Sequence, residues 1–244
     1  MPDVIRAAED PSEHWSGLLL SVGILALLVS IVLYIFVLGT PEGTGLDGEI
    51  TNQDFAQHIT TYEVLTRSIW FNEMVSSLLI AIAAFTLRGR TAHRKSAWPM
   101  ALLWTAVGVG ATIQVAGYGL TLGSYWHATA VVETDPALFD SLRGASSMIF
   151  GVGTLGVMGG LALLLFGEAR SSAPVIYAPI GYIGGFVGII GLGYPISFIT
   201  GVDAFLITAP LAFLFFPIVV YLGGMIWWGG RSPTELDVAA VKGE

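Results

Sequence analysis

The sequence predicts an all-α integral membrane protein, because it combines six long apolar stretches with few charged residues. The stretches cover residues 15–38, 68–87, 97–121, 145–166, 174–199 and 204–228. As helices rising ~1.5 Å per residue, they are long enough to cross a hydrocarbon core of ~30 Å. They are continuous rather than alternating, which favours helices over barrel strands. We therefore expect a six-transmembrane-helix bundle with short outer juxtamembrane helices.

The composition supports a single membrane domain. Of the 244 residues, 54% are hydrophobic and 11% are charged. Little sequence remains for a soluble domain of about 100 residues. We expect a transmembrane domain at residues 15–230 between cytoplasmic tails at 1–14 and 231–244. The lipid bilayer is the first expected partner, and no nucleic acid is expected.

The basic residues predict the orientation. With a cytoplasmic N-terminus, eight of the ten lysine and arginine residues lie inside and only Arg67 and Arg143 lie outside, as the positive-inside rule requires. The acidic N-terminal segment lacks the basic start of a signal peptide, so the first span is expected to be retained. We expect a multi-pass protein of the cell membrane with both termini cytoplasmic. Its acidic outer face either concentrates cations or reflects a salt-adapted or GC-rich source.

The outer loops at 39–66 and 122–144 carry helix signals. Apolar residues recur at helical spacing after Thr51, which predicts a short amphipathic helix leading into the second span. Thr134-Asp135-Pro136 supplies a cap and a first-turn proline, which predicts the start of the fourth long helix. Glycines in the fourth and fifth spans predict close helix packing. Pro210 and Pro217 predict bends in the last span.

Polar residues within the spans gather in the predicted outer half. Glu73 and Asn72 lie on the second span, and Gln114 and Tyr118 lie on the third, four residues apart. An ionisable group at span depth is expensive and marks a functional site by default. We therefore expect an outward-facing polar pocket bordered by Arg67 and Arg143. Alternatively, Glu73 is protonated or forms a structural ion pair with one of these arginines.

The sequence also restricts the cofactors. It contains no cysteine, which excludes iron–sulfur clusters, and no lysine lies within a predicted span for a retinal Schiff base. The four histidines all lie away from the predicted membrane centre, so no bis-histidine haem is expected.

A segment between the third and fourth spans carries a family resemblance. It reads Trp126-His127-Ala-Thr129-Ala-Val131-Val-Glu133-Thr134-Asp135. This resembles the C-type membrane subunit of the copper-dependent membrane monooxygenases, the particulate methane and ammonia monooxygenases, where a Trp-His-x-Thr-x-Val-x-acid-Thr-Asp pattern stands at the same point. Further matches are Gly45-Leu46-Asp47, Asn72-Glu73-Met74-Val75 and Ala209-Pro210-Leu211. The resemblance covers most of residues 45–228.

The resemblance implies copper ligands at two places, and this sequence departs from both. The first set falls on Gly123, His127 and Asp140, and the second falls near Tyr194, Phe198 and Ala212. One imidazole and one carboxylate make an incomplete site for copper or another divalent metal. Further donors would be Glu133, Asp135, Asp203, His58 or a residue of another subunit.

Two functions are consistent with these observations. The first is a membrane subunit of a monooxygenase-like oxidoreductase complex, with an altered metal site near the outer face and other membrane subunits as partners. The second is a solitary polytopic protein, acting as a transporter, sensor or assembly factor, that uses the pocket around Glu73 and Gln114 for a small solute.

Overall fold

The computed structural model describes residues 11–38, 51–92, 98–124, 128–171 and 174–228, and the regular elements in these ranges are all helical. Among the described residues, six segments are long and apolar enough to cross a membrane: His14–Leu38, Glu63–Arg88, Pro99–Ser124, Pro136–Ala169, Ala178–Thr200 and Ala204–Trp227. These segments confirm the positions of the six predicted helices.

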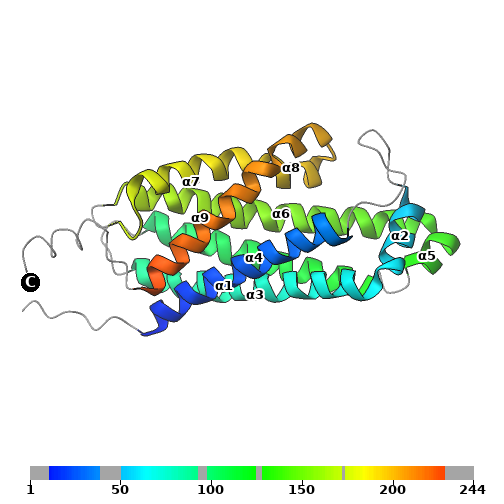
Figure 1. Ribbon diagram of the computed structural model, residues 1–244, viewed down its shortest axis with the longest axis horizontal. Helices are drawn as coiled ribbons and strands as arrows, with labels where there is room; N and C mark the ends of the chain where they lie inside the picture. Colours follow the sequence, from blue (N-terminus) through cyan, green and yellow to red (C-terminus); the bar gives the residue numbers. More distant parts are fainter. Residues whose placement is uncertain (1–10, 39–50, 93–97, 125–127, 172–173, 229–244) are drawn as a thin grey trace, which may run out of the picture.

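The described helices are labelled in Figure 1. They are α1 (Pro11–Leu33), a π-helix (Tyr34–Leu38), α2 (Asn52–Thr61), α3 (Glu63–Ala92), α4 (Trp98–Ser124), α5 (Ala128–Thr134), α6 (Pro136–Ala169), α7 (Ala178–Gly191), α8 (Gly193–Thr200), a 3-10 helix (Asp203–Thr208) and α9 (Ala209–Trp227).

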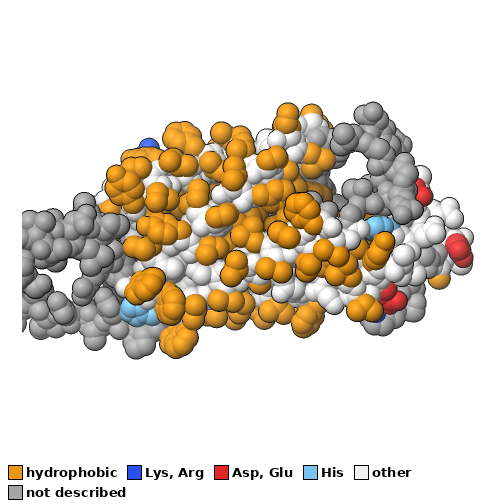
Figure 2. Space-filling view, in the orientation of Figure 1, with side chains coloured by type: hydrophobic (Ala, Val, Ile, Leu, Met, Phe, Trp, Pro, Cys, Tyr) orange, Lys and Arg blue, Asp and Glu red, His pale blue; other side chains and the backbone are white. Residues whose placement is uncertain are grey.

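The long helices pack in chain order around the bundle. α1 packs on α3, α3 on α4, α4 on α6 and α6 on α7, while α9 packs between α7 and α1. α1 begins and α9 ends at one end of the bundle, which we call the α1/α9 end (Figure 1). α2 and α5 lie at the opposite end, the α2/α5 end. A band of hydrophobic side chains covers the middle of the visible face (Figure 2).

Both predicted helix starts are confirmed. Thr51 caps α2, since its side chain accepts a hydrogen bond from the Asp54 amide at 3.1 Å, and the Asp54 carboxylate accepts one from the Thr51 amide at 3.3 Å. Asp135 caps α6 by accepting from the Leu138 amide at 3.0 Å, with Pro136 in the first turn. These caps satisfy amides that a helix start leaves unpaired.

The structure also contains breaks that the hydropathy pattern did not predict. The fifth apolar stretch is interrupted at Leu192, between α7 and α8, and the sixth begins with the 3-10 helix. Pro210 lies in the first turn of α9, where its missing amide costs no intrahelical hydrogen bond. Pro217 does lie inside α9.

Glycines allow close approach at two helix crossings, of which the α4/α6 crossing involves the fourth span, where close packing was predicted. Where α4 crosses α6, a Cβ on Gly110 would lie 2.7 Å from the Gly153 carbonyl oxygen. Where α1 crosses α9, a Cβ on Gly17 would lie 2.6 Å from the Gly223 carbonyl oxygen. Backbone atoms cannot rotate away from a new side chain, so these positions require glycine for the observed spacing.

Candidate functional site

The candidate site is centred on Glu73 and Tyr118, on neighbouring helices. Glu73 lies about 15 Å along α3 from its first residue, at ~1.5 Å per residue. The Tyr118 hydroxyl on α4 donates a hydrogen bond to the Glu73 carboxyl group. Tyr118 is only 7% exposed, whereas Glu73 is partly exposed. The two residues thus interact across the contact between α3 and α4.

Aromatic rings extend the site across two further helices. The ring of Tyr118 lies 6.0 Å from Phe150 on α6, and Phe150 lies 5.1 Å from Phe198 on α8. Phe198 in turn lies 5.1 Å from Tyr194. Edge-on packing of this kind is favourable for aromatic pairs. We call Glu73, Tyr118, Phe150, Tyr194 and Phe198 the carboxyl–aromatic cluster.

Two tyrosines lie where a long helix becomes irregular. Tyr194 follows directly after the interruption at Leu192, and its carbonyl oxygen accepts a 2.6 Å hydrogen bond from the Ser197 hydroxyl. Tyr34 is the first residue of the π-helix that follows α1, and its side chain is exposed. Single turns of π-helix are frequent at functional sites. Sequence reasoning missed Tyr34 and Phe150, since nothing in the hydropathy pattern separates them from lipid-facing aromatics.

Gln114 lies next to the cluster, in a separate and fully buried network. Its side chain accepts a 3.2 Å hydrogen bond from Ser77 of α3 and donates a 2.9 Å bond to Thr154 of α6. Gln114 is 4% exposed, so these bonds replace water for its amide. Asn72 faces α1 instead, where it donates 2.8 Å bonds to the Ala26 carbonyl and the Ser30 hydroxyl. Gln114 and Asn72 therefore link helices.

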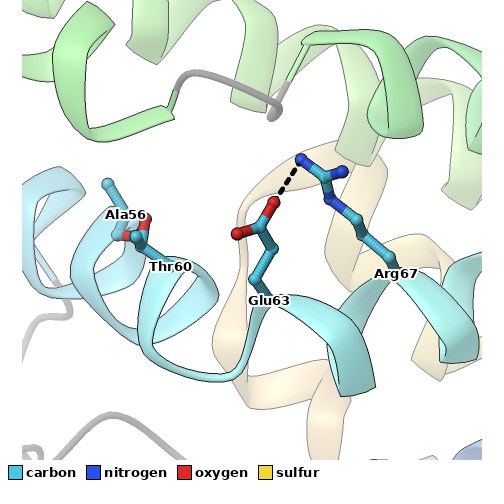
Figure 3. A network of polar contacts seen from close by, with 4 residues as sticks. All are labelled: Ala56, Thr60, Glu63 and Arg67. Carbon is cyan, nitrogen blue, oxygen red and sulfur yellow. Dashed lines mark hydrogen bonds and ion pairs between the residues drawn. The ribbon is translucent and has the colours of Figure 1, made fainter.

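The two arginines predicted to border the pocket have other partners. Arg67 pairs with Glu63 at 2.6 Å, one turn earlier on the same helix (Figure 3). Arg143 on α6 donates a 2.9 Å hydrogen bond to Asn52 of α2, and its guanidinium carbon lies 4.6 Å from the centre of the Phe55 ring. The contacts of Arg143 join the short helix α2 to α6. Glu73 itself hydrogen-bonds Tyr118.

The candidate metal ligands have separate local roles where they are described. The Asp140 carboxylate accepts a 3.3 Å hydrogen bond from Asn52, and Asp135 caps α6. Glu133 is exposed. His127 lies outside the described residues, as does the side chain of Asp203.

The ring of His58 on α2 lies 5.1 Å from the ring of Tyr62, the residue that follows this helix. Within the described ranges, no three histidine, aspartate or glutamate side chains come together as a metal site.

The second copper position implied by the resemblance contains aromatic side chains. Tyr194 and Phe198 are in ring contact, and Ala212 on α9 is fully buried. Copper favours imidazole ligands, and none of these three residues offers one. The residues at this position therefore do not fit a copper ion.

Comparison of the chain with models of protein families, with curated proteins and with solved structures gave no match. The likeness to the membrane monooxygenases therefore rests on the motifs in the sequence. A fold alone does not determine a function. The function has to be inferred from those motifs and from the chemistry of the carboxyl–aromatic cluster.

Proposed function

We propose that this chain is an integral membrane subunit of an oxygenase-like complex, a divergent relative of the C-type membrane subunit of the copper-dependent membrane monooxygenases. The observation that carries the proposal is the order and spacing of the matching motifs, from Gly45-Leu46-Asp47 through Trp126-His127 to Ala209-Pro210-Leu211. Six helices of membrane-spanning length support it. In this proposal both termini are cytoplasmic and the α2/α5 end faces outward.

The carboxyl–aromatic cluster is the substrate-binding region in this proposal. Glu73 and Tyr118 supply one polar pair, and the rings of Phe150 and Phe198 supply apolar surface. Binding sites commonly combine apolar walls with a few polar groups that set orientation. A small apolar or amine substrate matches this composition, and partner subunits supply the oxidation chemistry.

A metal ion is part of the same proposal only at His127 and Asp140. Two donors are fewer than the four ligands that zinc usually takes, and copper likewise needs more nitrogen donors. In this proposal another membrane subunit supplies the missing donors at the outer face.

Purification from the native membrane in a mild detergent tests the proposal. We expect the chain to elute with two further membrane subunits, and the complex to contain about one metal ion per chain. His127→Ala should remove that ion, whereas His14→Ala, at the opposite end of the bundle, should retain it. A species containing this chain alone would contradict the proposal of a complex. A complex without metal would contradict the proposed metal site.

A solitary polytopic protein is the second candidate function. It is favoured by the Glu73–Tyr118 hydrogen bond, which places a carboxyl group within a span. Ionisable groups at this depth commonly mark the pathway of a transported or bound solute. In that role the chain is a transporter, sensor or assembly factor that needs no oxygenase partner. Elution as a single-chain species that retains solute binding would favour this candidate.

A further inference from the structure

We propose that the carboxyl–aromatic cluster binds a small quaternary ammonium cation, of which choline is an example. This inference rests on the proposed function, since it assumes that the cluster is a ligand site, and it names the class of ligand. Its basis is the convergence of one carboxyl group and four aromatic rings from α3, α4, α6 and α8.

Glu73 supplies the charge that a cation requires. The carboxyl group accepts one hydrogen bond from Tyr118, while a carboxylate has room for about four. Its side chain is partly exposed, in contrast to Gln114, which is 4% exposed and bonded to two neighbours. A bound cation would compensate the charge at this depth, where an unpaired carboxylate is expensive.

The rings determine what kind of cation fits. Tyr118, Phe150, Phe198 and Tyr194 form a continuous series with centroid separations of 6.0, 5.1 and 5.1 Å. Aromatic faces attract cations, and cages of such rings recognise quaternary ammonium groups. The two phenylalanines have no hydrogen-bonding atoms, so they match methyl groups on nitrogen better than N–H groups. This favours a methylated ammonium over a primary amine.

The packing of the bundle gives the ligand one direction of approach. α1 and α9 are in close contact near the α1/α9 end, where the Ser21 hydroxyl donates a 3.0 Å bond to the Val220 carbonyl. The two helices diverge toward the α2/α5 end (Figure 1). Tyr34, on the diverging side, is 38% exposed. From the cluster toward the α1/α9 end, the centre of the bundle is filled by the fully buried side chains of Ile80, Met158 and Leu161. We therefore expect a ligand to approach Glu73 from the α2/α5 end and not through these buried side chains.

The charge at that end favours a cation. Glu63, Glu133, Asp135 and Asp140 are exposed there, and acidic side chains are visible at this end in Figure 2. The described arginines at this end, Arg67 and Arg143, are only partly exposed. A surface dominated by one sign of charge raises the local concentration of the opposite ion.

Ligand binding to the purified full-length protein in detergent tests this inference. Choline is the probe, and 3,3-dimethyl-1-butanol, which replaces the nitrogen by carbon, is the neutral control of the same shape. We expect saturable choline binding by calorimetry, with the neutral compound at least about 10-fold weaker. Equal binding of the two compounds would overturn the inference, because the site would then recognise shape without charge.

Variants locate the site. Glu73→Gln should weaken choline binding at least about 10-fold, while Glu63→Gln, which removes an exposed acid from the same helix, should leave it within about twofold. Tyr194→Leu removes one ring and should weaken binding about 2- to 30-fold, the range of a cation–π contact, whereas Tyr194→Phe keeps a ring and should stay within about threefold. If Glu73→Gln does not fold, the Tyr194 pair still decides the question.

The outcomes separate this inference from the proposed function. Absence of choline binding in a protein that co-purifies with its partner subunits overturns the ligand assignment and leaves the complex intact. Choline binding by a chain without partners supports the ligand assignment and contradicts the oxygenase complex. Choline binding that neither Glu73→Gln nor Tyr194→Leu weakens overturns the placement at this cluster.

Discussion

The two ends of the bundle are held together by different kinds of contact. Near the α1/α9 end, α1 meets α9 through glycine backbones at Gly17 and Gly223, and the centre is filled by apolar side chains, most of them aliphatic. The carboxyl–aromatic cluster lies toward the α2/α5 end. A second apolar cluster, which includes Ile69, Trp70 and Phe139, packs against Ala56 and Ile59 of the short helix α2.

This difference shows how one bundle combines rigidity with a site. Backbone contacts at small residues set the α1/α9 crossing, together with the hydrogen bond from the Ser21 hydroxyl to the Val220 carbonyl. With the crossings fixed at one end, the helices can diverge at the other and accept larger side chains there. We therefore expect the stability of the α1/α9 crossing to depend on side-chain volume. Toward the α2/α5 end, we expect ligand binding to depend on the chemical groups of the side chains.

The largest expected effect is the difference in thiol labelling between cysteines introduced at the two ends of the bundle, which reports which end faces outward. The chain has no native cysteine, so single cysteines can be introduced without a background. Gly45→Cys and Glu133→Cys should react with an impermeant thiol reagent in intact cells, whereas Thr91→Cys should not. Reaction at Thr91→Cys alone would reverse the orientation and place the carboxyl–aromatic cluster toward the cytoplasm.

The next largest effect tests the sensitivity of the α1/α9 crossing to volume. A Cβ on Gly223 would lie 2.8 Å from the Gly17 carbonyl oxygen and against the Ser21 hydroxyl, whereas a Cβ on Gly224 meets nothing within 4 Å. Gly223→Ala should lower the free energy of unfolding by about 1–3 kcal/mol, the cost of overpacking. Gly224→Ala should leave it unchanged or raise it, since alanine favours a helix.

Thermal unfolding of both variants in the same detergent measures the difference. Equal unfolding temperatures for Gly223→Ala and Gly224→Ala would show that the glycine contact does not set the distance between α1 and α9.

The smallest expected effect on stability is that of Glu73→Gln. Glutamine keeps an acceptor for the Tyr118 hydroxyl, so the unfolding temperature should change little while ligand binding is lost. If Glu73 were half of a buried ion pair, leaving an arginine unpaired would cost about 3–5 kcal/mol. A strongly destabilised Glu73→Gln protein with normal ligand binding would therefore assign this residue a structural role.

The sequence by itself determined the six long helices and the starts of α2 and α6. These features depend on local properties: apolar length, a capping side chain at Thr51 or Asp135, and a proline in the first helical turn. It also indicated that Glu73 and Tyr118 belong to one polar region, because both stand at similar depth on consecutive spans.

The tertiary structure alone decided which residues share the site. Tyr194 joins the cluster from α8, which begins after the helix breaks at Leu192. Arg143 contacts α2 through Asn52, a residue 91 positions away in the chain. Such contacts depend on the crossing of helices distant in sequence. Hydropathy records how apolar each segment is and carries no information on which helix it meets.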